Sequence, residues 1–372
     1  MKYLESWFRK VASLQIGIVG LPNVGKSTLF NALTDSSILA ANYPFATIEP
    51  NTGIVPVPDT RLQKLADIYN SKKILPATVT FVDIAGLVAG ASTGEGLGNQ
   101  FLSHIRSCNA ICQVVRAFDD PDILRSDSSK DPAYDIDVII TELVLADLQT
   151  VEKRLPRVAK EARANPKLKP AADTLESIKS LLDTGSPLWK DVDLLDAYRE
   201  HLSDLQLMTA KPILYLFNLD DEQLSNDTKK QELAQLVAPA PAVFVSAKLE
   251  DELRGLDTPD VLEMLESYGQ NEPGLNKVIH SAYDLLGLQS YLTAGEQEVR
   301  AWTIKQGATA PQAAGAIHGD FERGFIAAQI IDYNDLVTAG SEQAAKSAGK
   351  VRTEGKTYVM QPNDVVEFRF NV

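Results

Sequence analysis

Nine residues near the start of the chain, Gly20-Leu-Pro-Asn-Val-Gly-Lys-Ser-Thr28, constrain the fold more than any other segment. They follow an apolar run, residues 14–19, that predicts a buried strand, and they lead into residues 29–33, which predict the first turns of a helix. A strand, a Gly-x-x-x-x-Gly-Lys-Ser loop and a helix together form a phosphate-binding loop. A glycine-rich surface turn is the alternative, and the flanking strand and helix argue against it.

Such a loop directs backbone N–H groups and a helix N-terminus at the β-phosphate of a nucleotide. Lys26 adds a positive charge near the β- and γ-phosphates, and the Ser27 hydroxyl is a ligand for Mg²⁺. The predicted phosphate-binding residues are therefore Asn23, Val24, Gly25, Lys26, Ser27 and Thr28.

The composition excludes several classes of protein. A formal net charge of −14 argues against a general nucleic-acid binder, although it leaves room for a local basic patch. The two cysteines, Cys108 and Cys112, share one apolar segment and make a weak ligand set, which favours core packing in a reducing compartment over a metal site or disulfide. No run approaches the ~18 apolar residues of a membrane helix. Residues 1–13 predict a short docking helix or a disordered leader and not a targeting signal, so we expect a cytoplasmic protein without a membrane contact.

The order of predicted elements indicates an α/β fold with a doubly wound parallel sheet. Apolar strand-like runs at residues 14–19, 77–82 and 110–115 alternate with helical patterns, and the alternation returns at 212–217 and 242–245. A helical segment is inserted between the two parts. We predict a nucleotide-binding domain at 1–139 and 206–287, an inserted helical domain at 140–205 and a C-terminal domain at 288–372. The proline-punctuated connection after the first helix predicts a functional loop.

The inserted segment predicts two helices joined by the proline-containing tip 165–170, as an αα-hairpin or short coiled coil. Between residues 153 and 169 the sequence has one acidic residue, Glu161, and seven basic ones: Lys153, Arg154, Arg157, Lys160, Arg163, Lys167 and Lys169. Such a run is either a solvated helix face or a contact for a polyanion. In the C-terminal domain, strands are predicted at 299–304, 323–331, 356–360 and 365–370, with a helix at 310–317.

Asp83, Ile84, Ala85 and Gly86 end one of the apolar runs, where a carboxylate can hold Mg²⁺ through water. Gly86 has no side chain, so its backbone can approach a γ-phosphate closely. The alternative is an aspartate that caps the next turn. Leu87 follows where many GTPases carry a glutamine that orients the attacking water. Because leucine cannot hydrogen-bond water, hydrolysis is expected to be slow, to use another donor or to be assisted by the substrate.

Two further segments are expected to respond to the nucleotide. Thr47 lies in the long loop after the first helix and is the predicted ligand that completes the Mg²⁺ shell, with Thr52 as the alternative. The predicted metal ligands are therefore Ser27, Thr47 and Asp83. Four glycines between residues 90 and 98 predict either a segment that changes conformation or a plain flexible loop. The four histidines have no ligand spacing, and His104 is expected to lie at the surface or pack on a helix.

A base-binding site is predicted at the ends of two later strands. Asn218-Leu-Asp-Asp221 stands where guanine-specific proteins carry Asn-Lys-x-Asp, with Leu219 in place of the lysine and Asp221 keeping the carboxylate. Ser246, Ala247 and Lys248 follow the next strand as the complementary loop. We therefore predict that Asn218, Asp221 and residues 246–248 bind the base.

Together these motifs resemble those of the YchF/Obg-like ATPases. The resemblance rests on residues 20–28, 42–51, 83–87 and 94–101, and on residues 294–303, 307–315, 318–325 and 370–372, which are similar to that family's TGS domain. It spans residues 14–372 and implies a GTPase-like domain, an inserted coiled coil and a TGS module. It also implies a P-loop ATPase in which a hydrophobic residue, here Leu87, replaces the catalytic glutamine. Asn23 resembles the loop asparagine of K⁺-stimulated relatives.

The resemblance further implies Mg²⁺, a preference for ATP over GTP, and ribosome association in translation or stress response. Contacts to rRNA or ribosomal proteins are expected through the basic coiled coil and the TGS domain of a monomer. Two departures matter: Asp221 stands where the family usually has glutamate, and Arg125 lies near where many members carry a histidine. The assigned catalytic residues are Lys26, Thr47 and Gly86. The alternatives are a GTP-specific ribosome-assembly factor and a nucleotide-binding scaffold with negligible turnover.

Overall fold

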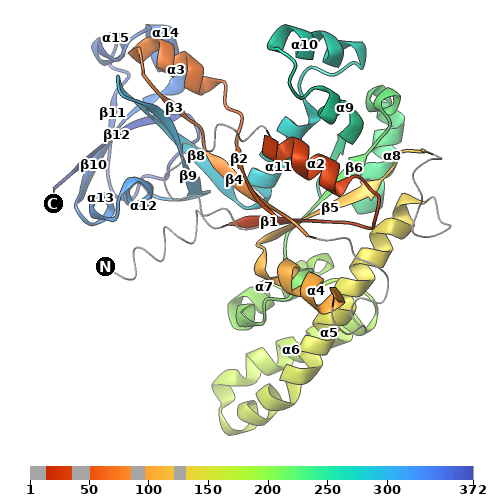
Figure 1. Ribbon diagram of the computed structural model, residues 1–372. Coiled ribbons are helices and arrows are strands. Elements are labelled where there is room, and N and C mark those ends of the chain that lie inside the picture. The colour runs from red at the N-terminus through yellow and green to blue at the C-terminus, as the bar shows by residue number, and fades with distance from the viewer. Residues whose placement is uncertain (1–13, 36–50, 85–96, 121–130, 372) are drawn as a thin grey trace.

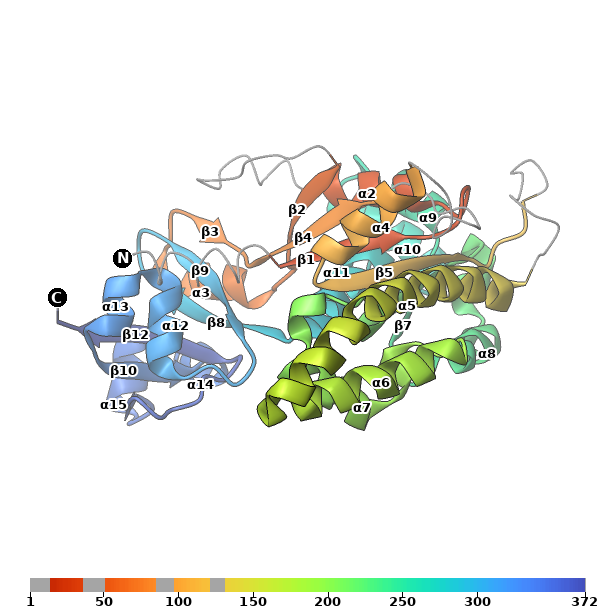
Figure 2. The ribbon, with the colours of Figure 1, turned by 90° about the horizontal axis from the view of Figure 1, so that it is seen from below.

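The computed structural model describes residues 14–35, 51–84, 97–120 and 131–371, arranged around two six-stranded sheets (Figures 1 and 2). The first sheet has the strand order β2-β4-β1-β5-β6-β7. Its strands are β1 (Gln15–Val19), β2 (Thr52–Pro56), β4 (Thr78–Asp83), β5 (Ala110–Arg116), β6 (Ile213–Asn218) and β7 (Ala242–Val245). The predicted apolar runs thus form a doubly wound α/β sheet, and every residue of β5 and β6 is buried, as expected for strands covered on both faces.

The strand β2 differs from the expectation of an all-parallel sheet. It pairs antiparallel with β4, from Thr52 opposite Val82 to Pro56 opposite Thr78. The sequence indicated a long loop here because prolines and a glycine punctuate it. Proline is tolerated at the edge of a sheet, where its missing N–H costs no ladder hydrogen bond, so this segment forms the edge strand next to β4.

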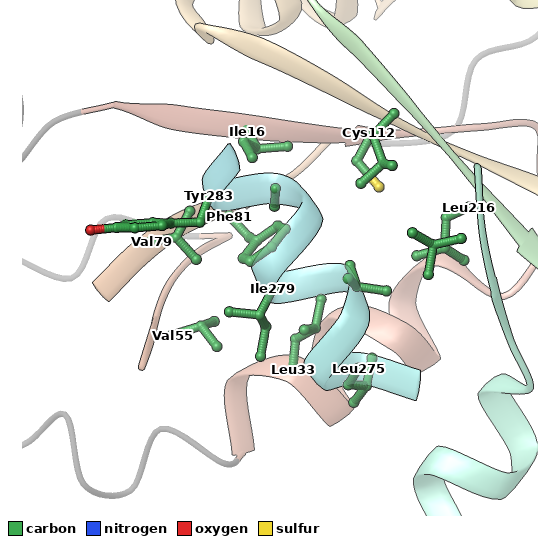
Figure 3. Close-up of a cluster of buried hydrophobic side chains, with 14 of the residues drawn as sticks. Ile16, Leu33, Val55, Val79, Phe81, Cys112, Leu216, Leu275, Ile279 and Tyr283 are labelled. Atoms are coloured by element: carbon green, nitrogen blue, oxygen red, sulfur yellow. The ribbon is translucent and has the colours of Figure 1, made fainter. Parts of the chain in front are cut away.

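Helices α2 (Lys26–Asp35) and α11 (Gly274–Leu285) cover one face of this sheet. Leu275, Ile279 and Tyr283 recur every four residues on α11, so they share one face of the helix and are buried. Figure 3 shows them beside Leu33 of α2 and side chains of the strands. Cys112 belongs to the same core, and burial raises the pKa of its thiol to about 12, in agreement with core packing rather than a reactive role.

The inserted segment forms the predicted helical hairpin. Helix α5 (Pro132–Ala164) and helix α6 (Lys169–Asp183) lie side by side, with the short 3-10 helix η2 (Pro166–Leu168) at the tip (Figure 2). A further helix, α7 (Val192–His201), which the sequence pattern did not reveal, packs on α6 and completes a separate core. At the base of the hairpin, the buried carboxylate of Asp147 accepts hydrogen bonds from the backbone N–H groups of Met208 and Thr209 and so ties α5 to the returning chain.

The C-terminal sheet has the order β11-β10-β12-β8-β9-β3. Its C-terminal strands are β8 (Leu288–Ala294), β9 (Val299–Lys305), β10 (Phe325–Asp332), β11 (Arg352–Glu354) and β12 (Asp364–Phe370), and α12 (Ala310–Ile317) occupies its predicted residues. The strand predicted at 356–360 is wrong: Val359 makes an isolated bridge to Thr309, and residues 355–361 form a turn-rich connection that delivers Gln361 to the buried Asp364 carboxylate.

An N-terminal segment joins the C-terminal sheet. Strand β3 (Ile74–Leu75) pairs with β9, opposite Val299 and Arg300, and helix α3 (Arg61–Tyr69) packs against β8, β9 and α14 (Tyr333–Ala339). Arg61 donates hydrogen bonds to the Pro362 carbonyl at 2.6 Å and to the Asn363 side chain at 3.1 Å. The chain between β2 and β4 is therefore built into the C-terminal sheet.

The remaining elements are α4 (Leu97–Ser107), η3 (Leu188–Lys190), η4 (Ser203–Leu205), η5 (Met208–Ala210), η6 (Asp221–Ser225), α8 (Asp227–Val237), α9 (Ala247–Glu252), α10 (Thr258–Ser267), α13 (Gly319–Arg323), α14 (Tyr333–Ala339) and α15 (Glu342–Ser347). Among the residues described, no helix combines the length and the apolar character that crossing a bilayer requires.

Candidate nucleotide-binding site

Residues 20–25 connect the end of β1 to the start of α2, as the motif predicts. Asn23 and Gly25 both have positive φ, of 60° and 97°, and this conformation turns the chain sharply before the helix. The N–H of Leu29 then donates to the Gly25 carbonyl at 3.0 Å, which closes the first helical turn. The N-terminus of α2 is thereby placed at the loop, where its N–H groups favour an anion.

Lys26 is the buried cation of this loop. Its side chain is 8% exposed, and its ammonium donates a hydrogen bond to the Leu21 carbonyl at 2.7 Å. Burial lowers its pKa to about 8, an effect that the nearby Asp83 carboxylate partly offsets. A buried ammonium without a full counter-charge favours a strongly anionic ligand, and a triphosphate is one.

Asp83 ends strand β4, and its N–H donates to the Asn51 carbonyl at 2.8 Å. Its Oδ1 atom is buried and has no hydrogen-bond partner among the residues described. Burial raises the pKa of the carboxyl, while the charge of Lys26 lowers it. Mg²⁺ takes oxygen ligands, often through water, so the orphaned oxygen of Asp83 and the exposed hydroxyl of Ser27 fit this ion. Thr47, Gly86 and Leu87 lie outside the residues that the structure describes.

Asn218, at the end of β6, joins the two predicted halves of the site. Its amide nitrogen donates to the Val24 carbonyl at 3.0 Å, and its amide oxygen accepts from the Ala247 N–H at 2.9 Å. The side chain is buried, and both its amide nitrogen and its amide oxygen bind backbone groups. The geometry gives Asn218 a positioning role between the phosphate loop and the loop at 246–248.

Asp221 is held by the loop at 246–248. Its carboxylate accepts a hydrogen bond from the Ser246 hydroxyl and lies 3.5 Å from the Lys248 ammonium. The charge of Asp221 is the main cause that raises the pKa of Lys248. Leu219 is 2% exposed. The sequence-predicted base residues are thus brought together, with Asp221 already engaged by two neighbours.

A cavity of about 830 Å³ lies between these two loops. Asn23, Gly25 and Thr28 line it on the phosphate side, and Asn218, Asp221 and residues 246–248 line it on the other. Phe118, which the sequence reading missed, lines the same cavity, and the buried guanidinium of Arg116 lies 4.3 Å from its ring centroid. Arg116 also donates to the Asp120 carbonyl at 3.0 Å. A lone charged residue at the end of the apolar run 110–116 was the available signal.

The surface position expected for His104 agrees with the structure. His104 is exposed on α4, and the described residues contain no group of three or more His, Cys, Asp or Glu side chains that could hold a metal. The Mg²⁺ site considered above is of a different kind, with one carboxylate, a hydroxyl and the phosphates of a ligand.

Comparison with known proteins finds matches for both the nucleotide-binding part and the C-terminal part of the chain. A family model described as a 50S ribosome-binding GTPase matches residues 15–148. The YchF-GTPase_C model, described as a protein of unknown function, matches residues 288–371. The structure of a GTP-binding protein from Pyrococcus horikoshii has a TM-score of 0.59 at 22% identity and shares the fold.

The full-length relatives are more similar. The ribosome-binding ATPase YchF of Bacillus subtilis is 49% identical over 366 residues, covering 97% of this chain and 100% of the relative. The protein of that name from Escherichia coli O157:H7 is 50% identical over 359 residues, covering 96% and 99%. The structure of the Schizosaccharomyces pombe YchF GTPase has a TM-score of 0.84 at 40% identity and covers 96% of this chain and 97% of that one. With this identity over nearly its whole length, the chain belongs to the YchF/Obg-like ATPase family.

Proposed function

We propose that this protein is a ribosome-associated, cytoplasmic nucleotide hydrolase that converts ATP to ADP and phosphate and acts as a nucleotide-dependent switch in translation or stress response. The observation that carries the proposal is the buried Lys26 ammonium beside the unpartnered Asp83 oxygen, at a loop of P-loop geometry. Relatives about half identical to this chain are named ribosome-binding ATPases, which supports the same activity.

The phosphates are bound by the backbone of residues 23–28 and by Lys26, which neutralises charge on the β- and γ-phosphates. Ser27 and Thr47 would hold Mg²⁺, with Asp83 acting through water, and the ion would supply positive charge to the same phosphate oxygens. Gly86, which has no side chain, would let the backbone approach the γ-phosphate. K⁺ is proposed as a stimulating cation beside Asn23. The monomer is the proposed working form.

Hydrolysis in this scheme depends on positioning and charge rather than on a side chain that orients water. Leu87 replaces the glutamine that performs this task in many GTPases, so basal turnover is slow. Burial of Lys26 supports the scheme, because charge pairs strengthen where water is excluded.

The base is bound in the cavity beside Phe118, with Asn218 holding both loops in register and Asp221 and residues 246–248 forming the far wall. ATP is the proposed substrate. GTP is the second candidate, because Asp221 retains the carboxylate with which guanine-specific proteins accept from the base. The Ser246 hydroxyl and the Lys248 ammonium hold that carboxylate at the cavity wall.

Ribosome binding is assigned to the basic tip of the α5–α6 hairpin and to the TGS domain. Within the cluster, Lys153, Lys160, Arg163, Lys167 and Lys169 are exposed. Arg157 forms an ion pair with Glu161 at 2.8 Å, which leaves most of the cluster's positive charge for a polyanion such as rRNA.

The helical arm is placed to respond to the nucleotide. Helix α4 follows the glycine-rich segment, and near its end the Arg106 guanidinium donates to the Thr150 hydroxyl of α5 at 3.2 Å. Ordering of the Thr47 and Gly86–Gly98 loops by a γ-phosphate would therefore bear on α5 through α4. Hydrogen exchange of the two loops and of α4 should differ between ATP-analogue and ADP states; identical profiles would remove this coupling.

Calorimetric titration with ATP and GTP, followed by turnover assays with and without ribosomes and K⁺, tests the proposal. We expect tighter ATP binding and slow turnover that ribosomes stimulate. Lys26→Ala should abolish turnover, while Lys277→Ala, an exposed lysine on α11, should leave it unchanged. Tighter GTP binding would favour the GTP-specific assembly factor, and binding without turnover under every condition would favour the scaffold.

A further inference from the structure

A second cavity, of about 710 Å³, lies in the C-terminal sheet, away from the nucleotide site. Strands β8 and β12 are neighbours there, yet they share a single register pair, Leu292 opposite Val365. Each of them pairs over seven residues with its other neighbour, β9 or β10. Past that single pair, residues 293–295 at the end of β8 and residues 366–368 of β12 both line the cavity. The cavity therefore opens where the two central strands stop pairing.

Aromatic side chains from four separate elements line this cavity: Tyr69 of α3, Trp302 of β9, Phe321 of α13 and Phe368 of β12. The Trp302 ring is fixed in place, because its Nε1 donates to the Thr293 hydroxyl at 2.9 Å. The chain's own Arg300 guanidinium lies 3.9 Å from the centroid of this ring in a cation–π contact. These walls suit a ligand with both apolar and cationic parts.

The charge around the cavity is negative. Glu296, Glu298, Glu342 and Glu367 line it, and Lys346 is its one lining cation among the residues described, paired with Glu342. Tyr69 reports the same field: burial, followed by the charges of Glu342 and Glu367, raises the pKa of its hydroxyl. Phosphates of RNA would be repelled here, whereas a cation would be attracted.

We propose that this cavity binds an extended, lysine- and arginine-rich segment of a partner polypeptide. The carboxylates pair with its cations, and the aromatic rings cover the apolar stems of the same side chains. A cavity between two strands that have ceased to pair suits an extended chain, whose backbone can hydrogen-bond beside a strand. Tyr69 comes from the segment between β2 and β4, so the bound segment would contact the nucleotide domain's own extension as well as the C-terminal strands.

The test uses the full-length protein and a fluorescein-labelled peptide, Gly-Lys-Val-Arg-Val-Lys-Gly, followed by fluorescence anisotropy. A peptide with glutamate at each basic position is the matched ligand control. We expect the basic peptide to bind and the acidic one not to bind. Since each exposed charge pair is worth up to ~1 kcal/mol, the double variant E298Q/E367Q should weaken binding by about fivefold or more at low salt.

The matched control is the double variant E263Q/E266Q, which removes two exposed carboxylates from α10 and should bind the peptide like the unchanged protein. Trp302→Leu should weaken peptide binding separately, and ATP affinity in all three variants should stay unchanged, which confirms that the nucleotide-binding part is folded. Equal affinity for the two peptides, or no effect of E298Q/E367Q, would overturn the proposal. Displacement of the peptide by micromolar spermine would indicate a polyamine site. If E298Q/E367Q bound labelled single-stranded RNA more tightly than it bound the basic peptide, the surface would be one for nucleic acid. Either result rejects a polypeptide ligand.

Discussion

The amide nitrogen of Asn218 lies 3.0 Å from the carbonyl oxygen of Val24, across 194 residues of sequence. On its other side the same amide accepts from Ala247. The phosphate loop and the base loop are therefore held in register by one buried side chain, and not only by the strands from which they emerge.

Asn218→Ala should weaken nucleotide binding and stability together. It leaves two buried backbone groups without a partner, at about 1–3 kcal/mol each, and frees the two loops from one another. We expect urea unfolding to show the loss of stability and calorimetry to show ATP affinity lowered by about tenfold or more. Asn226→Ala is the control, because it removes the N-cap of α8 and should reduce stability while sparing ATP affinity. Unchanged ATP affinity in Asn218→Ala would contradict the positioning role.

Gly25→Ala should abolish nucleotide binding. Gly25 has φ of 97°, and a Cβ atom there would lie 2.4 Å from the Asn218 amide nitrogen. Gly185→Ala shares the positive φ, at 79°, but its Cβ would meet no atom within 4 Å. Both variants should lose about 1–2 kcal/mol of stability from the left-handed backbone. We expect only Gly25→Ala to lose ATP binding in calorimetry; comparable ATP affinities in the two variants would show that the contact with Asn218 is unimportant.

ATP affinity should fall as the pH rises above 8. Burial lowers the pKa of Lys26 to about 8 in the free protein, and only its ammonium attracts the phosphates. At pH 9 about one tenth of free Lys26 is protonated, so ATP affinity should be roughly tenfold lower than at pH 7. Lys26→Ala should bind weakly and without this pH dependence. An identical pH profile in the two proteins would mean that another group titrates.

Stability should depend on Glu250 between pH 4.5 and 7. Its carboxylate accepts from the Gly274 N–H at 2.6 Å, but burial outweighs this bond and raises the pKa to about 7. The folded state therefore binds the proton more tightly than the unfolded state. The contribution of Glu250 to the free energy of unfolding is full below pH 4.5 and is lost as the pH rises through 7. The loss approaches about 3 kcal/mol. Urea unfolding should show this slope flattened in Glu250→Gln and retained in Glu263→Gln, an exposed control.

Ribosome binding should depend on the tip of the helical arm. Lys160→Glu combined with Lys167→Glu reverses two exposed charges there, and the reversal should weaken co-sedimentation with ribosomes and reduce its salt dependence. Lys64→Glu combined with Lys277→Glu, exposed positions on α3 and α11, is the control with the same change in net charge. Equal binding by the two double variants would exclude the arm as the ribosome contact.

The sequence was sufficient for the elements whose signal is local. The loop at residues 20–28, the apolar strands and the hairpin of α5 and α6 each carry their own periodicity or motif, and each was found where predicted. Helix α12 has the predicted bounds, and in the structure Thr309 and Gln312 form a capping box at its start.

What the sequence missed depends on distant partners. Strand β3 is two residues long and exists because β9, more than 200 residues later, pairs with it. Strand β2 required the edge position beside β4. The role of Phe118 became visible only from the structure, where it lines the base cavity beside the end of β6 with the Arg116 guanidinium over its ring. A single sequence holds no local signal for such pairings.

The pairing of β3 with β9 has a consequence for how the molecule can be taken apart. Cleavage of one peptide bond near residue 287 would not release the C-terminal fragment. The pairing of Ile74 and Leu75 with β9 and the hydrogen bond from Arg61 would still hold the two fragments together. The N-terminal and C-terminal fragments should then co-elute as one nicked protein. Fragments expressed separately should associate in solution. A chain that lost its C-terminal strands would therefore leave the apolar face of helix α3 uncovered.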